Sequence, residues 1–269
     1  MIENIYSCLG LKIYVYYTII NIVKVINKKN KSLLIIIPAR LDSTRLSKKL
    51  IRKISGVPMI LRVVQSAINT NLGDVIVATD SKQIQNLCKK QKVDSIITPT
   101  DIKSGTDRVY YAYEKLRKKY DLIINLQGDL PIFTKEILEK TVSLFNDKKT
   151  EIGSAVCDLH TSERKDKNVV KARVSLDRKN EGFAIDFCRK IENKEFFYHH
   201  IGLYVYSHES LKKFVKLSQS ENEIKRKLEQ MRAMDNNIKI KLVKVKEIPP
   251  SVDTFEDLKK IRLLFRKNK

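Results

Sequence analysis

The sequence predicts an α/β fold around a mostly parallel central sheet. Three strand-length segments are dominated by apolar residues: Leu33–Ile37, Asp74–Ala78 and Leu122–Leu126. Segments with helical spacing follow them: Pro58–Asn69, Gln83–Gln91, Asp107–Lys119 and Lys135–Phe145. Strands that alternate with helices are typical of βαβ units. The chain has 269 residues, of which 42% are hydrophobic, so one large α/β domain with a subdomain is expected.

Beyond about residue 150 the alternation loosens. The segments with strand character there are Ala155–Leu159, Lys171–Leu176, Phe183–Phe187, Gly202–Tyr206 and Lys239–Val245. One more short strand, Ser95–Ile97, is expected in the alternating part before residue 150. Two more helices are expected, a strongly charged one over Glu221–Met234 and a last one over Thr254–Phe265. Thr254 is a good N-cap, and Asp257 three residues later completes a pattern that resembles a capping box.

The first 31 residues stand apart from this pattern. Their apolar run, Leu9–Ile26, contains Lys12, Asn21 and Lys24, whereas a membrane span needs about 20 mostly apolar residues. The segment also lacks the basic start and cleavage site of a signal peptide. We therefore expect residues 1–31 to be an N-terminal extension, with a membrane-surface anchor as the alternative, and residues 32–269 to form the domain.

The chain has a large excess of positive charge. Lys and Arg number 53 against 31 Asp and Glu, a net charge of +22. Such a balance favours polyanionic partners such as nucleic acid, nucleoside triphosphates or anionic sugars; a merely lysine-rich surface is the alternative. The bases are scattered, without a run of six. The cysteines Cys8, Cys88, Cys157 and Cys188 form no CxxC pair, so we expect reduced thiols in a cytoplasmic protein.

Polar residues gather where the predicted strands end, which is where open α/β sheets bind ligands. After the first strand, Arg40, Arg45 and Lys49 can surround a triphosphate, because guanidinium groups grip phosphate oxygens in pairs and lysine adds a point charge. A solvated basic loop would look the same, and no Walker motif is present. Before a helix, the residues 104–108 (SGTDR) offer hydroxyls and backbone donors, although an ordinary helix cap explains them equally well.

Two acidic residues are candidate metal ligands. Asp129 follows the strand Leu122–Leu126, with Gly128 before it and Pro131 soon after. Asp253 lies just before the last helix, where a turn residue beside a cap is the alternative. Mg²⁺ prefers one or two carboxylates together with phosphate oxygens and water, and Asp129 and Asp253 can supply the carboxylates.

Eight segments, in order, resemble the 3-deoxy-manno-octulosonate (KDO) cytidylyltransferases, also called CMP-KDO synthetases. They are IIIPARLDSTRL, GVPMI, VIVATD, SGTDR, INLQGDLP, HHIGLYVYS, KLEQMRAM and SVDTFEDL, and the similarity runs from about Leu33 to Leu264. The resemblance implies a Rossmann-like nucleotide-diphospho-sugar transferase fold with helices on both faces. Residues 32–150 would bind the nucleotide, residues 151–250 would bind the sugar and form the dimer, and a C-terminal helix would cover residues 254–265.

The resemblance also implies an activity. The enzyme would be a cytoplasmic homodimer without stable membrane association or nucleic acid, using Mg²⁺, CTP and an acidic eight-carbon sugar. The anomeric hydroxyl would attack the α-phosphate and pyrophosphate would leave, giving CMP-KDO for lipopolysaccharide synthesis. Asp129, Asp253 and Lys49 would be catalytic, with both acids as metal ligands. The nucleotide-binding residues would be Arg40, Arg45, Lys49, Ser104, Gly105, Thr106 and Arg108. The residues of the sugar site would be Gln127, Arg189, His200, Tyr204, Glu229 and Gln230, with Arg189 and His200 as candidates for the sugar carboxylate.

The chain departs from the family pattern in three places. Leu130 replaces the Glu of QGDEP, and Ser47-Lys48-Lys49 replaces Pro-Gly-Lys, so choosing Lys49 over Lys48 rests on alignment. Lys190-Ile191 replaces the Ile-Pro that usually follows Arg189. An enzyme for 8-amino-KDO or a sialic-type acid remains an alternative, although the first loop differs from the sialic type. A basic nucleic-acid-binding protein is the alternative from another class.

Overall fold

The computed structural model describes residues 31–42, 45–191 and 195–267. The chain divides into two compact units, Met1–Ser32 and Leu33–Lys269, and the fold below is that of the second. The predicted extension lies outside the described residues except for Lys31. In the described part of the chain, no helix is both long and apolar enough to cross a membrane.

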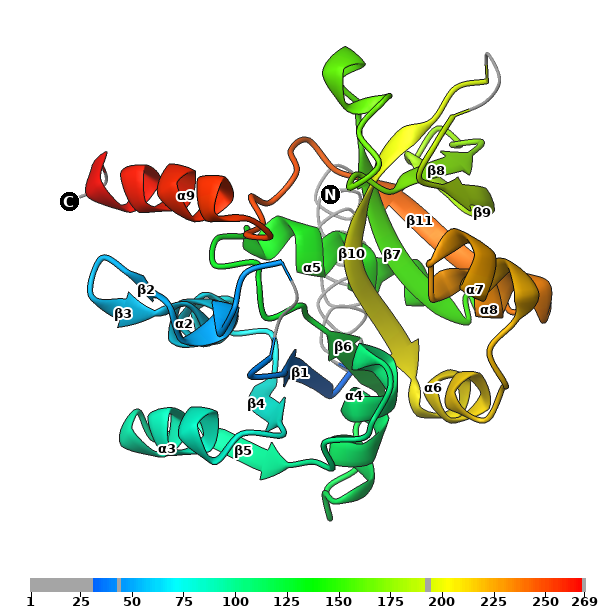
Figure 1. Cartoon of the computed structure of the whole chain (residues 1–269). Coiled ribbons are helices and arrows are strands. Elements are labelled where there is room, and N and C mark those ends of the chain that lie inside the picture. Colours follow the sequence, from blue (N-terminus) through cyan, green and yellow to red (C-terminus); the bar gives the residue numbers. More distant parts are fainter. Residues whose placement is uncertain (1–30, 43–44, 192–194, 268–269) are drawn as a thin grey trace, which may run out of the picture. The chain divides into compact units, whose positions relative to one another are not determined.

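The amino-terminal half of the sheet is parallel. Its strands are β1 (Leu33–Ala39), β4 (Asp74–Thr79), β5 (Asp94–Ile97) and β6 (Leu122–Asn125), arranged in the order β5-β4-β1-β6 (Figure 1). A two-stranded hairpin, β2 (Lys53–Ile54) with β3 (Val57–Pro58), follows the first loop and was not expected from the sequence.

Strand β1 is buried on both faces, which explains its uninterrupted apolar run. Leu33, Ile35 and Ile37 pack in one core with residues of α2 (Met59–Asn69) and α3 (Lys82–Lys90). Leu34 and Ile36 pack in a second core with residues of α4 (Gly105–Glu114) and α6 (His208–Val215). Because alternate side chains of a strand point to opposite faces, helices cover both faces of the sheet, as predicted.

The carboxy-terminal half of the sheet is mixed. It contains β7 (Ile152–Cys157), β8 (Lys171–Val174), β9 (Glu181–Cys188), β10 (Tyr198–Ser207) and β11 (Ile240–Lys244). Strand β10 is antiparallel to β6 and β7, and the order continues β10-β7-β11-β9-β8. Since β8 also pairs with β10, these strands close into a circuit. One end of β10 therefore adjoins the nucleotide half and the other end adjoins β8.

Two helices differ from the prediction. The single helix expected over Glu221–Met234 is broken into α7 (Glu221–Arg226) and α8 (Gln230–Asp235), because Lys227 adopts the left-handed conformation with φ 55°. The break folds Arg232 back onto Glu223, which it contacts at 2.7 and 2.8 Å. Helix α4 begins two residues earlier than expected, because Ser104 caps it by accepting the Asp107 N–H at 3.0 Å.

Helix α6 was not predicted, whereas the other helices lie close to their predicted ranges. Helix α5 (Lys135–Ser143) is followed by a short 3₁₀ turn (Leu144–Asn146), and another 3₁₀ turn covers Thr161–Glu163. The last helix, α9 (Phe255–Lys267), has the expected cap: Thr254 Oγ1 accepts the Asp257 N–H at 3.2 Å, and the Asp257 carboxylate accepts the Thr254 N–H at 2.9 Å.

Candidate active site

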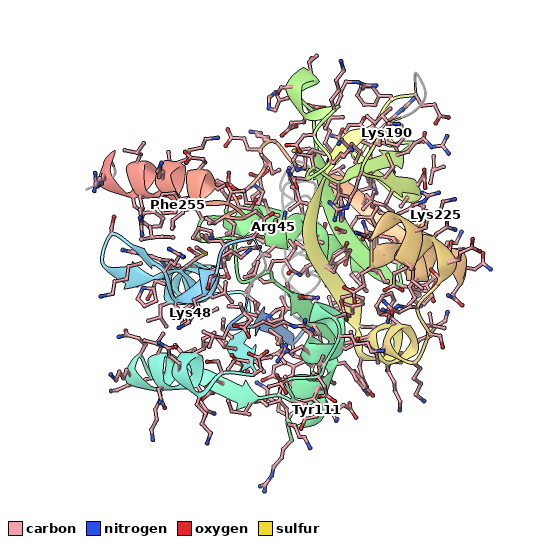
Figure 2. All side chains as sticks on the ribbon, in the orientation of Figure 1. Arg45, Lys48, Tyr111, Lys190, Lys225 and Phe255 are labelled. Carbon is pink, nitrogen blue, oxygen red and sulfur yellow. The ribbon has the colours of Figure 1, made fainter. Side chains whose placement is uncertain are left out.

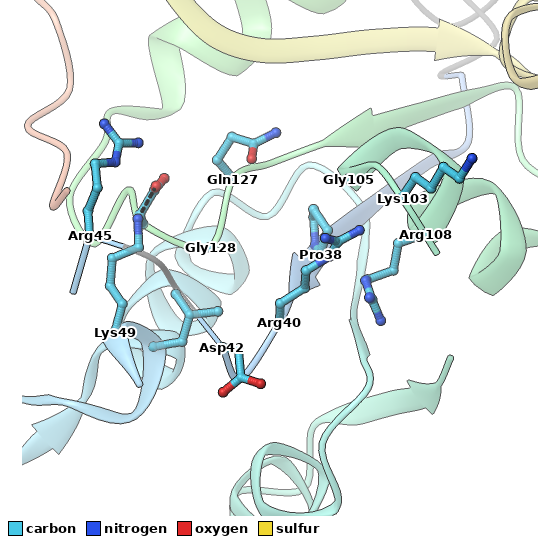
Figure 3. A pocket seen from close by; sticks show the side chains of 12 residues that line it. Pro38, Arg40, Asp42, Arg45, Lys49, Lys103, Gly105, Arg108, Gln127 and Gly128 are labelled. Carbon is cyan, nitrogen blue, oxygen red and sulfur yellow. Dashed lines mark hydrogen bonds and ion pairs between the residues drawn. The ribbon is translucent and has the colours of Figure 1, made fainter. Parts of the chain in front are cut away.

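A cleft of about 390 Å³ opens at the carboxyl ends of β1 and β6 (Figure 3). Most of the residues that line it come from the first loop, the start of α4 and the loop after β6. They are Pro38, Arg40, Asp42, Arg45, Lys49, Leu50, Lys103, Gly105, Arg108, Gln127, Gly128 and Asp129. The cleft therefore joins the three polar clusters that the sequence placed at strand ends.

The two candidate metal ligands meet at the side chain of Lys49. Its Nζ lies 2.7 Å from Asp129 Oδ2 and 3.1 Å from Asp253 Oδ1, and Arg45 Nη2 lies 3.0 Å from the same Asp253 oxygen. Burial lowers the pKa of Lys49, but the two carboxylates outweigh it, so its pKa is raised and the ammonium stays charged. Acids 124 positions apart in sequence thus reach one cation, as the sequence hypothesis requires.

Backbone contacts hold the two acidic loops together. The Val252 N–H donates to the Asp129 carbonyl at 3.0 Å, which ties the residue before Asp253 to the loop after β6. Gly128 allows this loop to approach β1 closely. A Cβ at position 128 would lie 3.1 Å from the Pro38 carbonyl oxygen and 3.3 Å from the methyl groups of Leu50.

The first loop has an unusual backbone at Lys48. Lys48 has φ 52° and ψ 38°, the left-handed region that glycine adopts at the least cost, and it stands where the family pattern given above has the Gly of Pro-Gly-Lys. The turn starts a 3₁₀ segment, Lys49–Ile51, whose Leu50 is buried. Lys48 is exposed, whereas Lys49 faces both acids, so the structure supports the choice of Lys49.

The SGTDR segment combines capping with a buried ion pair. Arg108 lines the cleft but is fully buried, and its guanidinium contacts the Asp80 carboxylate at 3.0 Å and the hydroxyl of Thr98. Burial lowers the pKa of Arg108, and Asp80 opposes the change. Asp80 also accepts the Leu41 N–H at 3.1 Å, while the Arg40 guanidinium donates to the Ile102 carbonyl.

Asp80 was missed by the sequence reasoning. It immediately follows β4, as Asp129 lies in the loop after β6, so the rule that singled out acids at strand ends could have found it. Its contacts connect the first loop to α4, and it is therefore a positioning residue for the cleft.

Three of the predicted sugar-site residues lie together. Tyr204, Glu229 and Gln230 line a narrow hollow of about 10 Å³, so within the described part of the chain these side chains surround no sugar-sized cavity. Burial raises the pKa of Glu229, and the hydroxyls of Ser104 and Thr106 oppose the rise. The SGTDR segment thus contacts the sugar-site residues as well as the nucleotide cleft.

The other predicted sugar-site residues are spread around this group. Gln127 lines the nucleotide cleft, where its amide donates to Asn125 Oδ1 at 3.3 Å. Arg189 donates to the carbonyls of Lys167, Asn168 and Lys227 at 3.1, 3.3 and 3.3 Å. Burial lowers the pKa of Arg189, Arg45 lowers it further and Asp253 opposes the change.

The environment of His200 limits how it could bind the sugar carboxylate, for which it is a candidate. The side chain is buried, its Nε2 lies 2.9 Å from Ser154 Oγ, and burial lowers its pKa to about 3. The imidazole is therefore neutral near pH 7, and it can offer a hydrogen bond but no charge. Cys88 and Cys157 are buried free thiols, and burial raises their pKa values to about 11 and about 12, so neither is a nucleophile.

Comparisons with known proteins identify the family of the chain. A family model described as cytidylyltransferase matches residues 34–240. The 3-deoxy-manno-octulosonate cytidylyltransferase of Bartonella tribocorum is 40% identical over 237 residues, covering 85% of this chain and 96% of the relative. The enzyme of the same name from Francisella tularensis subsp. holarctica is 36% identical over 243 residues, covering 86% and 97%.

Solved structures match as well. CMP:2-keto-3-deoxy-manno-octonic acid synthetase complexed with CTP has a TM-score of 0.80 at 30% identity and covers 88% of this chain and 100% of that one. A 4-diphosphocytidyl-2C-methyl-D-erythritol synthase from Anaerococcus prevotii shares the fold alone, with a TM-score of 0.62 at 11% identity and coverage of 88% and 100%.

The fold, the basic cleft and the family match define a nucleotidyltransferase of the cytidylyltransferase class. The sequence identity to the two relatives, most of whose length the chain covers, points to one family within this class. The chain belongs to the 3-deoxy-manno-octulosonate cytidylyltransferase, or CMP-KDO synthetase, family.

Proposed function

We propose that this enzyme transfers CMP from CTP to KDO, releasing pyrophosphate. The observation that carries the proposal is the convergence of Asp129 and Asp253 on one cation at the edge of a cleft lined by arginines. Phosphoryl-type transfer needs positioning and neutralisation of charge more than covalent help. These residues supply both at one place.

The first loop positions the triphosphate. Arg40, Arg45 and Lys49 lie around the cleft, and Arg45 is half exposed, so its guanidinium is accessible to a ligand (Figure 3). Guanidinium forks and the ammonium bind the β- and γ-phosphates, which become the leaving pyrophosphate. Ser104, Gly105, Thr106 and Arg108 frame the remainder of the nucleotide from the start of α4.

The residues present fit a magnesium ion. Asp129 and Asp253 already share one cation, the Lys49 ammonium, and Mg²⁺ typically takes one or two carboxylates with phosphate oxygens and water. In the described ranges, no cluster of three or more His, Cys, Asp or Glu side chains is placed to hold a metal ion by itself. When bound, Mg²⁺ would neutralise phosphate charge and lower the pKa of the attacking hydroxyl.

The six predicted sugar-site residues would form the sugar site around Arg189. Arg189 is the cation for the sugar carboxylate. His200, as a neutral ring, together with Gln127, Tyr204, Glu229 and Gln230, supplies hydrogen bonds to sugar hydroxyls. We also propose that the enzyme is a cytoplasmic homodimer that supplies CMP-KDO for lipopolysaccharide synthesis.

The basic surface does not require a nucleic-acid partner. Among the exposed lysines labelled in Figure 2, Lys48 lies apart from Lys190 and Lys225, which belong to the carboxy-terminal half. A dispersed charge of this kind supports attraction of a small anionic substrate better than a continuous nucleic-acid groove.

Pyrophosphate release tests the proposal. The protein is incubated with CTP, Mg²⁺ and a panel of KDO, 8-amino-KDO and a sialic acid, and release is expected with KDO foremost. Asp129→Asn should lower the rate by at least about 100-fold with the fold intact, as for other groups that stabilise transition-state charge. The control is Asp74→Asn, which lies at the amino end of β4, whereas the cleft opens at the carboxyl ends of the strands. This variant should keep the rate. Normal turnover by the Asp129 variant would remove this acid from the mechanism.

A further inference from the structure

The acid pair already holds cations that the protein itself supplies. The Lys49 ammonium contacts Asp129 at 2.7 Å and Asp253 at 3.1 Å, and its side chain is only 12% exposed. Arg45 adds a second positive contact to Asp253 at 3.0 Å. The two negative charges are therefore matched by two positive charges, both from the first loop.

A divalent cation and this ammonium need the same oxygens. Carboxylates are the protein ligands that Mg²⁺ prefers, so Asp129 and Asp253 would hold the ion with the carboxylates that now accept the Lys49 ammonium. Such an ion would add two positive charges to a set that is already neutral. It would also break two charge-assisted hydrogen bonds, of 2.7 and 3.1 Å, and bonds of this kind are among the stronger ones in proteins.

The side chain of Lys49 can move without the backbone. The backbone is fixed by the 3₁₀ turn Lys49–Ile51, whose Leu50 is 6% exposed and packs in the core. Lys49 also lines the nucleotide cleft, so rotation of its flexible stem brings the ammonium from the acids to an anion in the cleft.

We propose that Lys49 and the divalent cation compete for the Asp129–Asp253 pair, and that the triphosphate decides the competition by drawing the ammonium to its own oxygens. The inference rests on the proposed function, because it takes the nucleotide to be a triphosphate. Its consequence is an order of binding: the free enzyme holds divalent ions weakly, and the metal enters with or after the nucleotide. Lys49 is then a gate on the metal site as well as a phosphate ligand.

Binding of Mn²⁺ to the nucleotide-free protein tests the first half. Free Mn²⁺ is followed by electron paramagnetic resonance for wild type, Lys49→Met, Lys48→Met and the double variant Lys49→Met/Asp129→Asn, with thermal unfolding as the check on folding. Lys49→Met should bind Mn²⁺ at least about ten-fold tighter, equivalent to about 1.4 kcal/mol. Lys48→Met removes the same charge from an exposed neighbour and should stay within about two-fold of wild type, since exposed charges are screened.

The double variant tests whether the gain in Mn²⁺ affinity depends on the acid pair, and we expect the gain to be absent from it. Equal Mn²⁺ affinity in wild type and Lys49→Met, an equal gain in Lys48→Met, or a gain that survives the Asp129 change would each overturn the proposal.

Adding CTP without sugar tests the second half. CTP should tighten Mn²⁺ binding to wild type, because the triphosphate draws the Lys49 ammonium away from the acids. The difference in Mn²⁺ affinity between wild type and Lys49→Met should therefore become smaller. A difference that is unchanged by CTP would refute the role of the triphosphate. These readouts are separate from turnover: failure of pyrophosphate release would sink the proposed function, whereas normal release with no change in Mn²⁺ affinity on loss of Lys49 would sink only this inference.

Discussion

Replacing Asp80 by Asn should weaken both the fold and the nucleotide site. The Asp80 carboxylate, whose side chain is 13% exposed, contacts the fully buried Arg108 guanidinium at 3.0 Å and the Leu41 N–H at 3.1 Å. Asn keeps an acceptor for Leu41 but loses the negative charge, which leaves the buried guanidinium with Thr98 as its remaining side-chain partner among the described contacts. Breaking a buried pair in this way typically costs about 3–5 kcal/mol, and we expect about 3 kcal/mol because Asp80 is partly exposed and Asn retains one hydrogen bond.

The measurements are urea unfolding and the KM for CTP. The KM should rise several-fold, because Leu41 and Arg108 hold two sides of the cleft, while kcat changes less. Asp74→Asn, at the start of β4 where Asp80 follows its end, is the matched control: its ion pair with Lys118 is more than half exposed on both sides, so the loss should stay below about 1 kcal/mol.

A double variant separates the ion pair from general damage. Asp80→Asn combined with Arg108→Met removes both charges, so it should be less destabilised than the two single losses added together. If the losses simply add, or if Asp80→Asn unfolds like wild type, the argument that Asp80 compensates a buried charge is wrong.

Three further predictions follow from single side chains. Arg189→Ala should raise the KM for the sugar about ten-fold or more with little change in the KM for CTP, as expected for loss of a charge-assisted contact; an effect on CTP alone would show that Arg189 is misplaced here. His200→Gln should flatten the loss of stability on acidification, because the folded pKa of about 3 lies below the unfolded value of about 6.5, so wild type loses stability as the pH falls from 6.5 toward 3. The free energy of unfolding, measured with urea, should fall between pH 7 and pH 5 by about 2 kcal/mol less in the variant than in wild type. An equal fall in both proteins would contradict a neutral His200. Lys48→Gly should raise the free energy of unfolding by about 0.5–1 kcal/mol, because glycine relieves the left-handed strain at φ 52° but gains entropy in the unfolded chain; a loss measured in the same assay would refute this.

Much of the fold could be predicted because it depends on local patterns. The buried strands of the parallel half are continuous apolar runs, and β1 shows why: its alternate side chains enter two different cores. The caps at Ser104 and Thr254 depend on residues within one turn and are likewise visible in the sequence. By contrast, the helix break at Lys227 was missed, because a lysine gives no local sign of a left-handed conformation that tertiary contacts stabilise.

The sequence by itself determined the family, the two acids and the basic loop, since these are runs of residues at strand ends whose chemistry is legible without coordinates. Only the tertiary structure decided which lysine faces the acids, that Asp80 compensates the buried Arg108, and that His200 is neutral. The physical reason is that these properties depend on desolvation and on charges brought together from distant segments. Electrostatic energies change several-fold with burial and distance, and neither quantity is encoded by spacing along the chain.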